Sequence, residues 1–185
     1  MTHLTLHRLE PHETLAMPEH HGEFDRHTRA LAVLPDFARH PPQVLNGDLR
    51  ATDAFELLRR GHARVRMVVD PAGEFEGLVT LDCLGEDSLL KRVARGEHRA
   101  EICVRDVMIR RPDLPALAWS DLESGATLGD LADTLEQYDE AFCLVYDGGR
   151  IRSLIAAEEL AEHLGMRLNV GVRPSFARIF DAVHR

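Results

Sequence analysis

The sequence is poor in aromatic residues, in cysteine and in long apolar stretches. Aromatic residues make up 5% of the 185 residues, and no apolar run approaches the roughly 20 residues that a membrane-spanning helix needs. The three cysteines, Cys83, Cys103 and Cys143, form no C-x-x-C motif, which favours reduced thiols. The first residues lack the basic-then-apolar pattern of a signal peptide. We therefore expect a cytoplasmic protein that makes no contact with a membrane.

Positive charge is also scarce. The 22 lysines and arginines are outnumbered by 31 aspartates and glutamates, which gives a net charge of −9. This charge opposes binding to nucleic acid and to anionic membranes. The sequence contains no Ser-His-Asp set, phosphate-binding loop or dinucleotide fingerprint, so we expect no enzyme. Six of the eleven histidines lie in residues 1–27. Among them His12, His20, His21 and His27 show no helical i, i+4 pairing and no cysteine partner, and we expect no metal site there.

What the sequence does contain is an internal repeat with an offset of 77 residues. Apolar residues at helical spacing occur at Ala51, Ala54, Phe55 and Leu58, and again at Leu128, Leu131, Ala132 and Leu135. Strand-like segments repeat at the same offset, at Met67–Asp70 and Leu144–Asp147. The offset becomes 76 after the next turn, where Gly77–Thr80 corresponds to Ser153–Ala156. A single slip in a glycine-containing turn indicates two copies of one structural unit.

Each copy is predicted to contain a strand, a helix, two strands and a helix. In the first copy these are a strand at 44–45, a helix over 51–60, strands at 64–69 and 75–80, and a helix from 81. In the second copy they are an extended piece at 114–119, a helix after 127, strands at 141–146 and 150–155, and a helix over 156–164. We expect Gly61 to end its helix in the left-handed conformation. Thr127 and Asp130 have the spacing of a capping box.

These features resemble the cystathionine-β-synthase (CBS) domain, which occurs in tandem pairs. The resemblance rests on Val68–Asp82, Val104–Met108 and Leu144–Leu160, and the tail Ser175–Ile179 resembles that of small bacterial stand-alone CBS-pair proteins. It implies an α/β (α+β) fold in which two β-α-β-β-α units pack as a pseudo-twofold CBS pair, also called a Bateman module. The expected divisions are a His-rich extension at 1–28, CBS units at 29–100 and 101–166, and a C-terminal helix within 167–185.

The resemblance also implies a function. CBS pairs bind AMP, ADP, ATP or S-adenosylmethionine between their units, often form homodimers, and regulate an attached or partner protein without catalysis. In the family pattern a glycine opens a strand, a threonine or serine ends it, and an aspartate follows three residues later. The first unit has Gly77 and Thr80, but Cys83 takes the aspartate position, and Asp82 would point about 100° away from it on a helix.

The second unit departs further from the pattern, with Ser153, Ala156 and Glu159 at the three positions. The candidate ligand-binding residues are therefore Val65, Arg66, Gly77, Thr80, Asp82 and Glu159. Arg64 and Arg66 are candidates for binding an anion or are simply solvated residues on a strand. Two hypotheses stay open. The chain is a sensor of an adenosine-type ligand that modulates an unidentified partner, or a degenerate CBS pair that acts as a dimeric scaffold.

Overall fold

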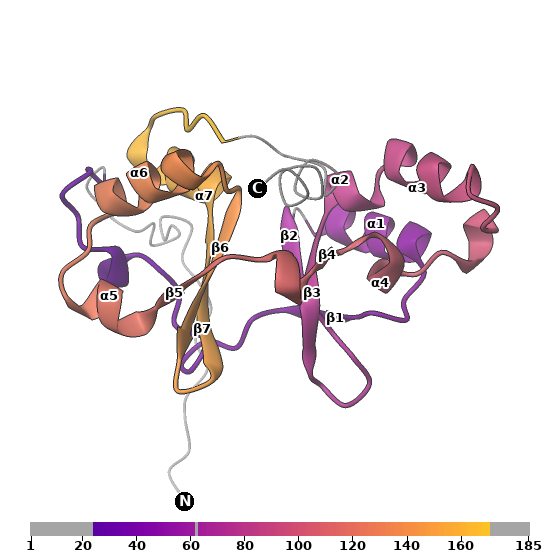
Figure 1. Cartoon of the computed structure of the whole chain (residues 1–185), viewed down its shortest axis with the longest axis horizontal. Coiled ribbons are helices and arrows are strands. Elements are labelled where there is room, and N and C mark those ends of the chain that lie inside the picture. Colours follow the sequence, from indigo (N-terminus) through magenta and orange to yellow (C-terminus); the bar gives the residue numbers. More distant parts are fainter. Residues whose placement is uncertain (1–23, 62, 171–185) are drawn as a thin grey trace, which may run out of the picture.

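The computed structural model describes residues 24–61 and 63–170, which form two similar units side by side (Figure 1). Each unit is a small sheet covered by helices on its outer side, and the two sheets face one another. The predicted fold class, a mixed α/β pair of repeated units, is confirmed. No helix within the described ranges is long and apolar enough to cross a bilayer.

The first unit is built on a four-stranded sheet. Its strands, in spatial order, are β1 (Val44–Asn46), β2 (Val65–Val69), β3 (Phe75–Thr80) and β4 (Ile109–Arg110). β1 runs parallel to β2, and the other neighbours are antiparallel. The associated helices are α1 (Ala51–Arg60), α2 (Leu81–Leu84), α3 (Glu86–Val93) and α4 (Val104–Val107). Burial of Ala51, Ala54 and Leu58 along one face of α1 produces the helical spacing seen in the sequence.

The second unit repeats this plan with a three-stranded sheet. Its strands are β5 (Ala116–Ala118), β6 (Phe142–Asp147) and β7 (Arg150–Ala156), and its helices are α5 (Trp119–Glu123), α6 (Leu128–Tyr138) and α7 (Ala157–Leu164). Short 3-10 helices occur at η1 (Ala30–Ala32), η2 (Arg99–Glu101) and η3 (Arg111–Asp113). A cluster of Met67, Leu78 and Leu144, flanked by Phe142 and Leu154, joins the two sheets.

The helix ends agree with the sequence in two of three cases. The predicted capping box of α6 is confirmed, because Thr127 Oγ1 accepts from the Asp130 N–H while Asp130 accepts from the Thr127 N–H. Gly165 ends α7 in the left-handed conformation, with φ +60°. The prediction for Gly61 is wrong, since its φ is −81° and its N–H continues to bond the Leu57 carbonyl as in a helix. Helix α1 therefore ends without a residue in the left-handed conformation at Gly61.

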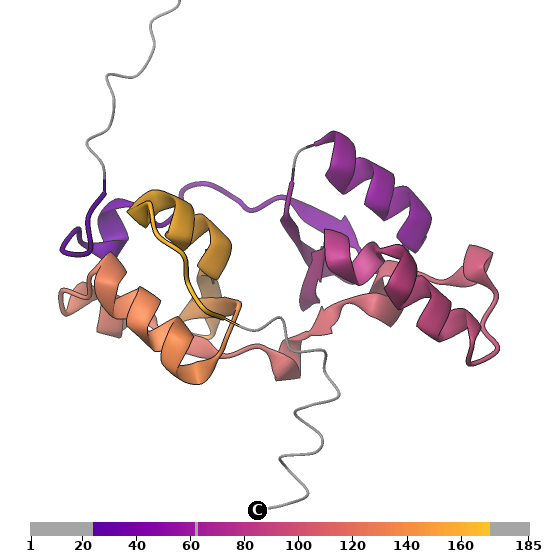
Figure 2. The same cartoon turned by 90° about the horizontal axis from the view of Figure 1, so that it is seen from above.

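The segment that leads into each unit packs against the opposite unit. We call residues 24–37 and 99–110 the leading segments. Ala30 is fully buried in the core of the second unit, and its N–H donates to the Ala126 carbonyl at 2.9 Å. In the same way Val104 is buried in the core of the first unit, and its N–H donates to the Leu49 carbonyl at 2.8 Å. In both views the first leading segment lies beside the second unit's helices (Figure 1 and Figure 2).

This exchange differs from the division suggested by the repeat. The predicted boundaries at residues 29 and 101 assign each leading segment to the unit that follows it, whereas the packing assigns the segments crosswise. Most of the predicted extension at 1–28 and of the C-terminal helix at 167–185 lies outside the described residues. Within 167–170, Leu168 and Val170 pack against the core of the second unit.

One further difference separates the two copies. β1 and β5 correspond at an offset of 72 residues, since Val44 pairs with Met67 and Ala116 with Leu144. α1 and α6 correspond at an offset of 77, so the second unit carries five additional residues before its long helix. Helix α5 forms in this insertion and has no counterpart in the first unit. The short extended piece predicted within 114–119 is confirmed as β5, and α5 begins directly after it at Trp119.

Candidate functional site: a cleft between the two units

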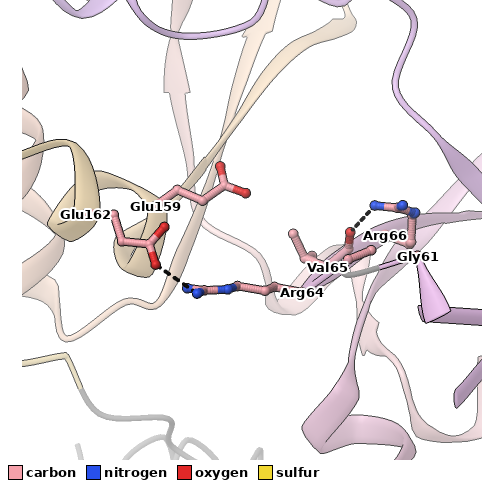
Figure 3. Close-up of a pocket in the computed structure, with 7 residues that line it drawn as sticks. Gly61, Arg64, Val65, Arg66, Glu159 and Glu162 are labelled. Atoms are coloured by element: carbon pink, nitrogen blue, oxygen red, sulfur yellow. Dashed lines mark hydrogen bonds and ion pairs between the residues drawn. The ribbon is translucent and has the colours of Figure 1, made fainter. Parts of the chain in front are cut away.

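A cleft of about 280 Å³ lies between the start of β2 in the first unit and α7 in the second. It is lined by Gly61, Ala63, Arg64, Val65, Arg66, Glu159 and Glu162. Figure 3 shows the two glutamates on one wall and the three residues of the 64–66 segment on the other. Three of the six predicted ligand residues, Val65, Arg66 and Glu159, thus meet in one place.

Arg64 connects the two walls of the cleft. Its Nη1 lies 2.6 Å from Glu158 Oε1 and its Nη2 lies 2.8 Å from Glu162 Oε1. The charge of Glu158, followed by that of Glu162, raises the pKa of the Arg64 guanidinium above its ordinary value. All three side chains are largely exposed, so solvent screens both pairs and they add little to stability. Weak bonds of this kind can be exchanged for contacts to a ligand at small cost.

Arg66 and Glu159 keep bonding capacity in the cleft. Arg66 Nη1 donates to the Val65 carbonyl at 3.1 Å, and its side chain points away from α7 (Figure 3). The Glu159 carboxylate makes no hydrogen bond or ion pair with any residue that the structure describes. Each therefore has groups available to a bound molecule, an N–H fork on one wall and two acceptor oxygens on the other.

The N-terminus of α7 carries acidic residues in place of a hydroxyl cap. Ala156, which precedes the helix, has no side chain that could accept from its first N–H groups. Glu158 and Glu159 occupy the first turn, where negative charge complements the helix dipole. A phosphate placed here would meet carboxylates of the same sign. The electrostatics of this end of the cleft therefore favour a diol or a neutral polar group.

The remaining predicted residues of the first unit lie elsewhere and have other tasks. Thr80 caps α2, because its Oγ1 accepts from the Cys83 N–H at 3.2 Å and lies 3.3 Å from the Cys83 Sγ. Asp82 is exposed in the first turn of α2. Gly77 is buried in β3, where a Cβ would collide with the Ile109 carbonyl oxygen. The glycine of the family pattern thus has a packing cause, the close approach of β4.

Sequence reasoning missed the acidic wall of the cleft. Glu158 and Glu162 bind Arg64 from successive turns of α7, and neither was among the predicted residues. Their spacing of four residues was a usable signal, because residues four apart lie on the same face of a helix. Arg64 as their partner was not predictable, since it comes from the other unit.

Comparison with known proteins agrees with this architecture. Residues 34–84 match the model of the CBS domain family. The first unit matches the CBS domain family. The second unit repeats the plan of the first, and the chain has the fold of a CBS pair. A comparison with curated proteins found no match.

Several solved structures resemble the CBS pair over both units. An uncharacterized conserved protein from Pyrococcus horikoshii is 16% identical, with a TM-score of 0.53 over 80% of this chain and 100% of its own. CBSX2, solved in complex with AMP, is 16% identical, with a TM-score of 0.50 over 85% of this chain and 99% of its own. A hemolysin-like CBS-domain protein of Oenococcus oeni PSU is 15% identical, with a TM-score of 0.51 over 75% of this chain and 91% of its own. At these identities the likeness concerns the fold.

Proposed function

We propose that this CBS pair is a regulatory module that binds a small adenosine-type ligand in the cleft between its units and thereby modulates a partner protein. The observation that carries the proposal is the meeting of Val65, Arg66 and Glu159 in one cleft with contributions from both units. CBSX2, a structural neighbour, was solved with AMP, which supports an adenine nucleotide as the first ligand to test. We propose no catalytic role for the chain.

The chemistry of the cleft suggests how such a ligand binds. The Glu159 carboxylate is suited to accept both hydrogen bonds of a ribose diol, and the Arg66 guanidinium to donate to an anionic or polar group. Glu158 and Glu162 of α7 pair with Arg64, Glu159 adds a third carboxylate on the same helix, and the Arg66 side chain points away from α7. Ligands with little negative charge, AMP or S-adenosylmethionine, are therefore favoured over ATP.

Regulation follows from the position of Arg64. A ligand that occupies the cleft competes with the two ion pairs from Arg64 to α7, which connect the units. Binding then shifts the population between arrangements of the pair in which these bonds are made or broken. The resulting change in geometry is what a partner would detect.

Thermal denaturation and calorimetric titration with AMP, ADP, ATP and S-adenosylmethionine test the proposal. A ligand at 100 times its Kd should stabilise the protein by about 2.7 kcal/mol. We expect Glu159→Gln to weaken binding about tenfold or more, since a ribose diol loses a charged acceptor. Asp82→Asn is the matched control, because Asp82 is exposed outside the cleft. Absence of binding by all four compounds, or an equal loss in both variants, would refute the proposal.

The alternative is a degenerate pair that binds no nucleotide and acts as a dimeric scaffold. It is favoured by the Thr80 hydroxyl, which is occupied in capping α2, and by Ala156, which offers no hydroxyl to α7. Exposed apolar side chains on α1 and α3 provide surface for a homodimer: Leu57, Leu90 and Val93. Light scattering at micromolar concentration tests this, since a dimer that forms without any ligand response supports the scaffold.

A further inference from the structure

A second cleft, of about 360 Å³, lies on the second unit alone, where α5 meets the turn between β6 and β7. It is lined by Ala118, Trp119, Ser120 and Glu123 from the α5 region and by Tyr146, Asp147, Gly148 and Arg152 from the hairpin. None of these residues lines the cleft between the units. The two clefts are therefore separate sites.

This second cleft is specific to one copy of the repeat. Half of its lining comes from Ala118 and from α5, the helix that forms in the five-residue insertion. Trp119, the first residue of α5, is the single tryptophan of the chain. The CBS architecture does not require these residues, because the first unit forms the same sheet and long helix without them.

The floor of the cleft already holds one guanidinium. The Arg152 guanidinium carbon lies 4.2 Å from the centroid of the Trp119 ring. Its Nε and Nη2 donate to the two Asp36 oxygens at 3.0 and 2.9 Å, and its Nη1 donates to Asp147 Oδ2 at 2.9 Å. Arg152 is thus neutralised by two carboxylates and has little capacity left for an anion.

The rim is acidic and aromatic. Glu123 accepts from the Trp119 indole N–H at 3.0 Å through one oxygen, which leaves the other available. Tyr146 is 47% exposed although it is a large aromatic side chain. The lining carries two carboxylates, those of Glu123 and Asp147, against the single guanidinium of Arg152, so its net charge is negative. Asp36 lies beside the cleft and pairs with both Arg152 and Arg39. Cations are attracted both by these carboxylates and by the faces of the aromatic rings.

We infer that this cleft binds an arginine or lysine side chain presented by a partner protein. The bound Arg152 shows that this surface accepts a guanidinium stacked on an indole and paired with carboxylates. Tyr146 and the second oxygen of Glu123 offer an aromatic face and a carboxylate at the rim. A protein is favoured as the source because tyrosine, tryptophan and arginine are the residues that dominate binding energy at protein interfaces. The excess of acidic residues in the whole chain speeds encounter with a basic partner.

The single tryptophan provides a direct assay. Titration of the full chain with a capped tetra-arginine peptide, with excitation of Trp119 alone, should give a saturable change in emission, whereas tetra-glutamate and tetra-serine peptides should give none. We expect Tyr146→Ala and Glu123→Gln each to weaken the peptide about two- to fivefold. Glu74→Gln is the control, because Glu74 is an exposed carboxylate in the hairpin of the first unit.

Each outcome decides the matter. Saturation by tetra-arginine, together with weaker binding in the two cleft variants and unchanged binding in the control, supports the inference. A response that is absent, that occurs equally with tetra-serine, or that weakens equally in Glu74→Gln overturns it. The melting temperatures of Tyr146→Ala and Glu123→Gln are first shown to match that of the parent. Calorimetry then measures their affinity for the peptide, so that weaker binding is not caused by unfolding. Addition of AMP should leave the tetra-arginine affinity unchanged, which separates this result from that of the cleft between the units.

Discussion

Replacing Gly77 by alanine tests the packing of the first sheet. Gly77 lies in β3, between β2 and β4, and pairs with Arg110 of β4. An added Cβ would collide with the Ile109 carbonyl oxygen, and it would also lie 3.1 Å from the Ile109 carbonyl carbon and 3.2 Å from the Arg110 Cα. All three atoms are backbone, so no side-chain rotation relieves the collision, and β4 must move.

The cost can be worked from what β4 loses. It pairs with β3 only at Gly77–Arg110 and Leu78–Ile109, and each backbone hydrogen bond lost contributes about 1 kcal/mol. Overpacking of a filled core costs about 1–3 kcal/mol by itself. Displacement of β4 relieves the overpacking, so the two costs are alternatives, and we expect Gly77→Ala to reduce the free energy of unfolding by about 1–3 kcal/mol. For a chain of this size that corresponds to a fall in melting temperature of about 2–12 °C.

Urea unfolding followed by circular dichroism measures this loss. Hydrogen exchange should also show faster exchange at the backbone amides of β4, since that strand is the one displaced. A change in the free energy of unfolding below about 0.5 kcal/mol, which is the usual range for surface substitutions, would refute the reasoning. It would mean that β4 is not held against β3 as described.

Three further outcomes are expected. Ser153→Ala should raise the free energy of unfolding by about 1 kcal/mol in the same urea assay, because the buried Ser153 hydroxyl has no hydrogen-bond partner among the described residues, and a loss of stability would contradict this. The Arg152 guanidinium lowers the pKa of Asp36 to about 2, so this carboxylate stabilises the fold above pH 4, and that contribution is lost as the pH falls from 4 to 2. Asp36→Asn should flatten this part of the stability curve in acid titration, and an unchanged slope would count against the pair. Burial raises the pKa of the Cys143 thiol to about 11, so thiol-reactive reagents at pH 8 should label it only after unfolding, as mass spectrometry can show, and labelling in the folded state would contradict its burial.

Local patterns in the sequence predicted the regular elements well. The helix at 51–60 and the strand at 75–80 have the bounds that were expected, because apolar spacing there reports burial directly. Helix α5, which begins at Trp119, was not predicted, because an insertion in one copy carries no repeat signal. The helix end at Gly61 was misjudged since glycine permits a left-handed conformation but does not impose it.

The candidate site was predictable only in part. Val65, Arg66 and Glu159 line one cleft, and their role in binding a ligand stays a prediction. Thr80 was expected to serve a ligand, but its hydroxyl has a nearer partner in the Cys83 N–H, and this competition depends on geometry at the helix start. The Arg64 bridge and the exchange of leading segments join residues that are far apart in the sequence. No local periodicity encodes such contacts.

The exchange of leading segments also sets an order of events during synthesis. Ala30 docks on Ala126, which is added to the chain 96 residues later. At synthesis rates of roughly 5–20 residues per second, the first leading segment waits about 5–20 s for its partner. The core of the first unit likewise stays open until Val104 has emerged. The first unit, which spans residues 44–110 without a break, can therefore close its core before the second unit is made, whereas the second unit needs a segment from the start of the chain to complete its own.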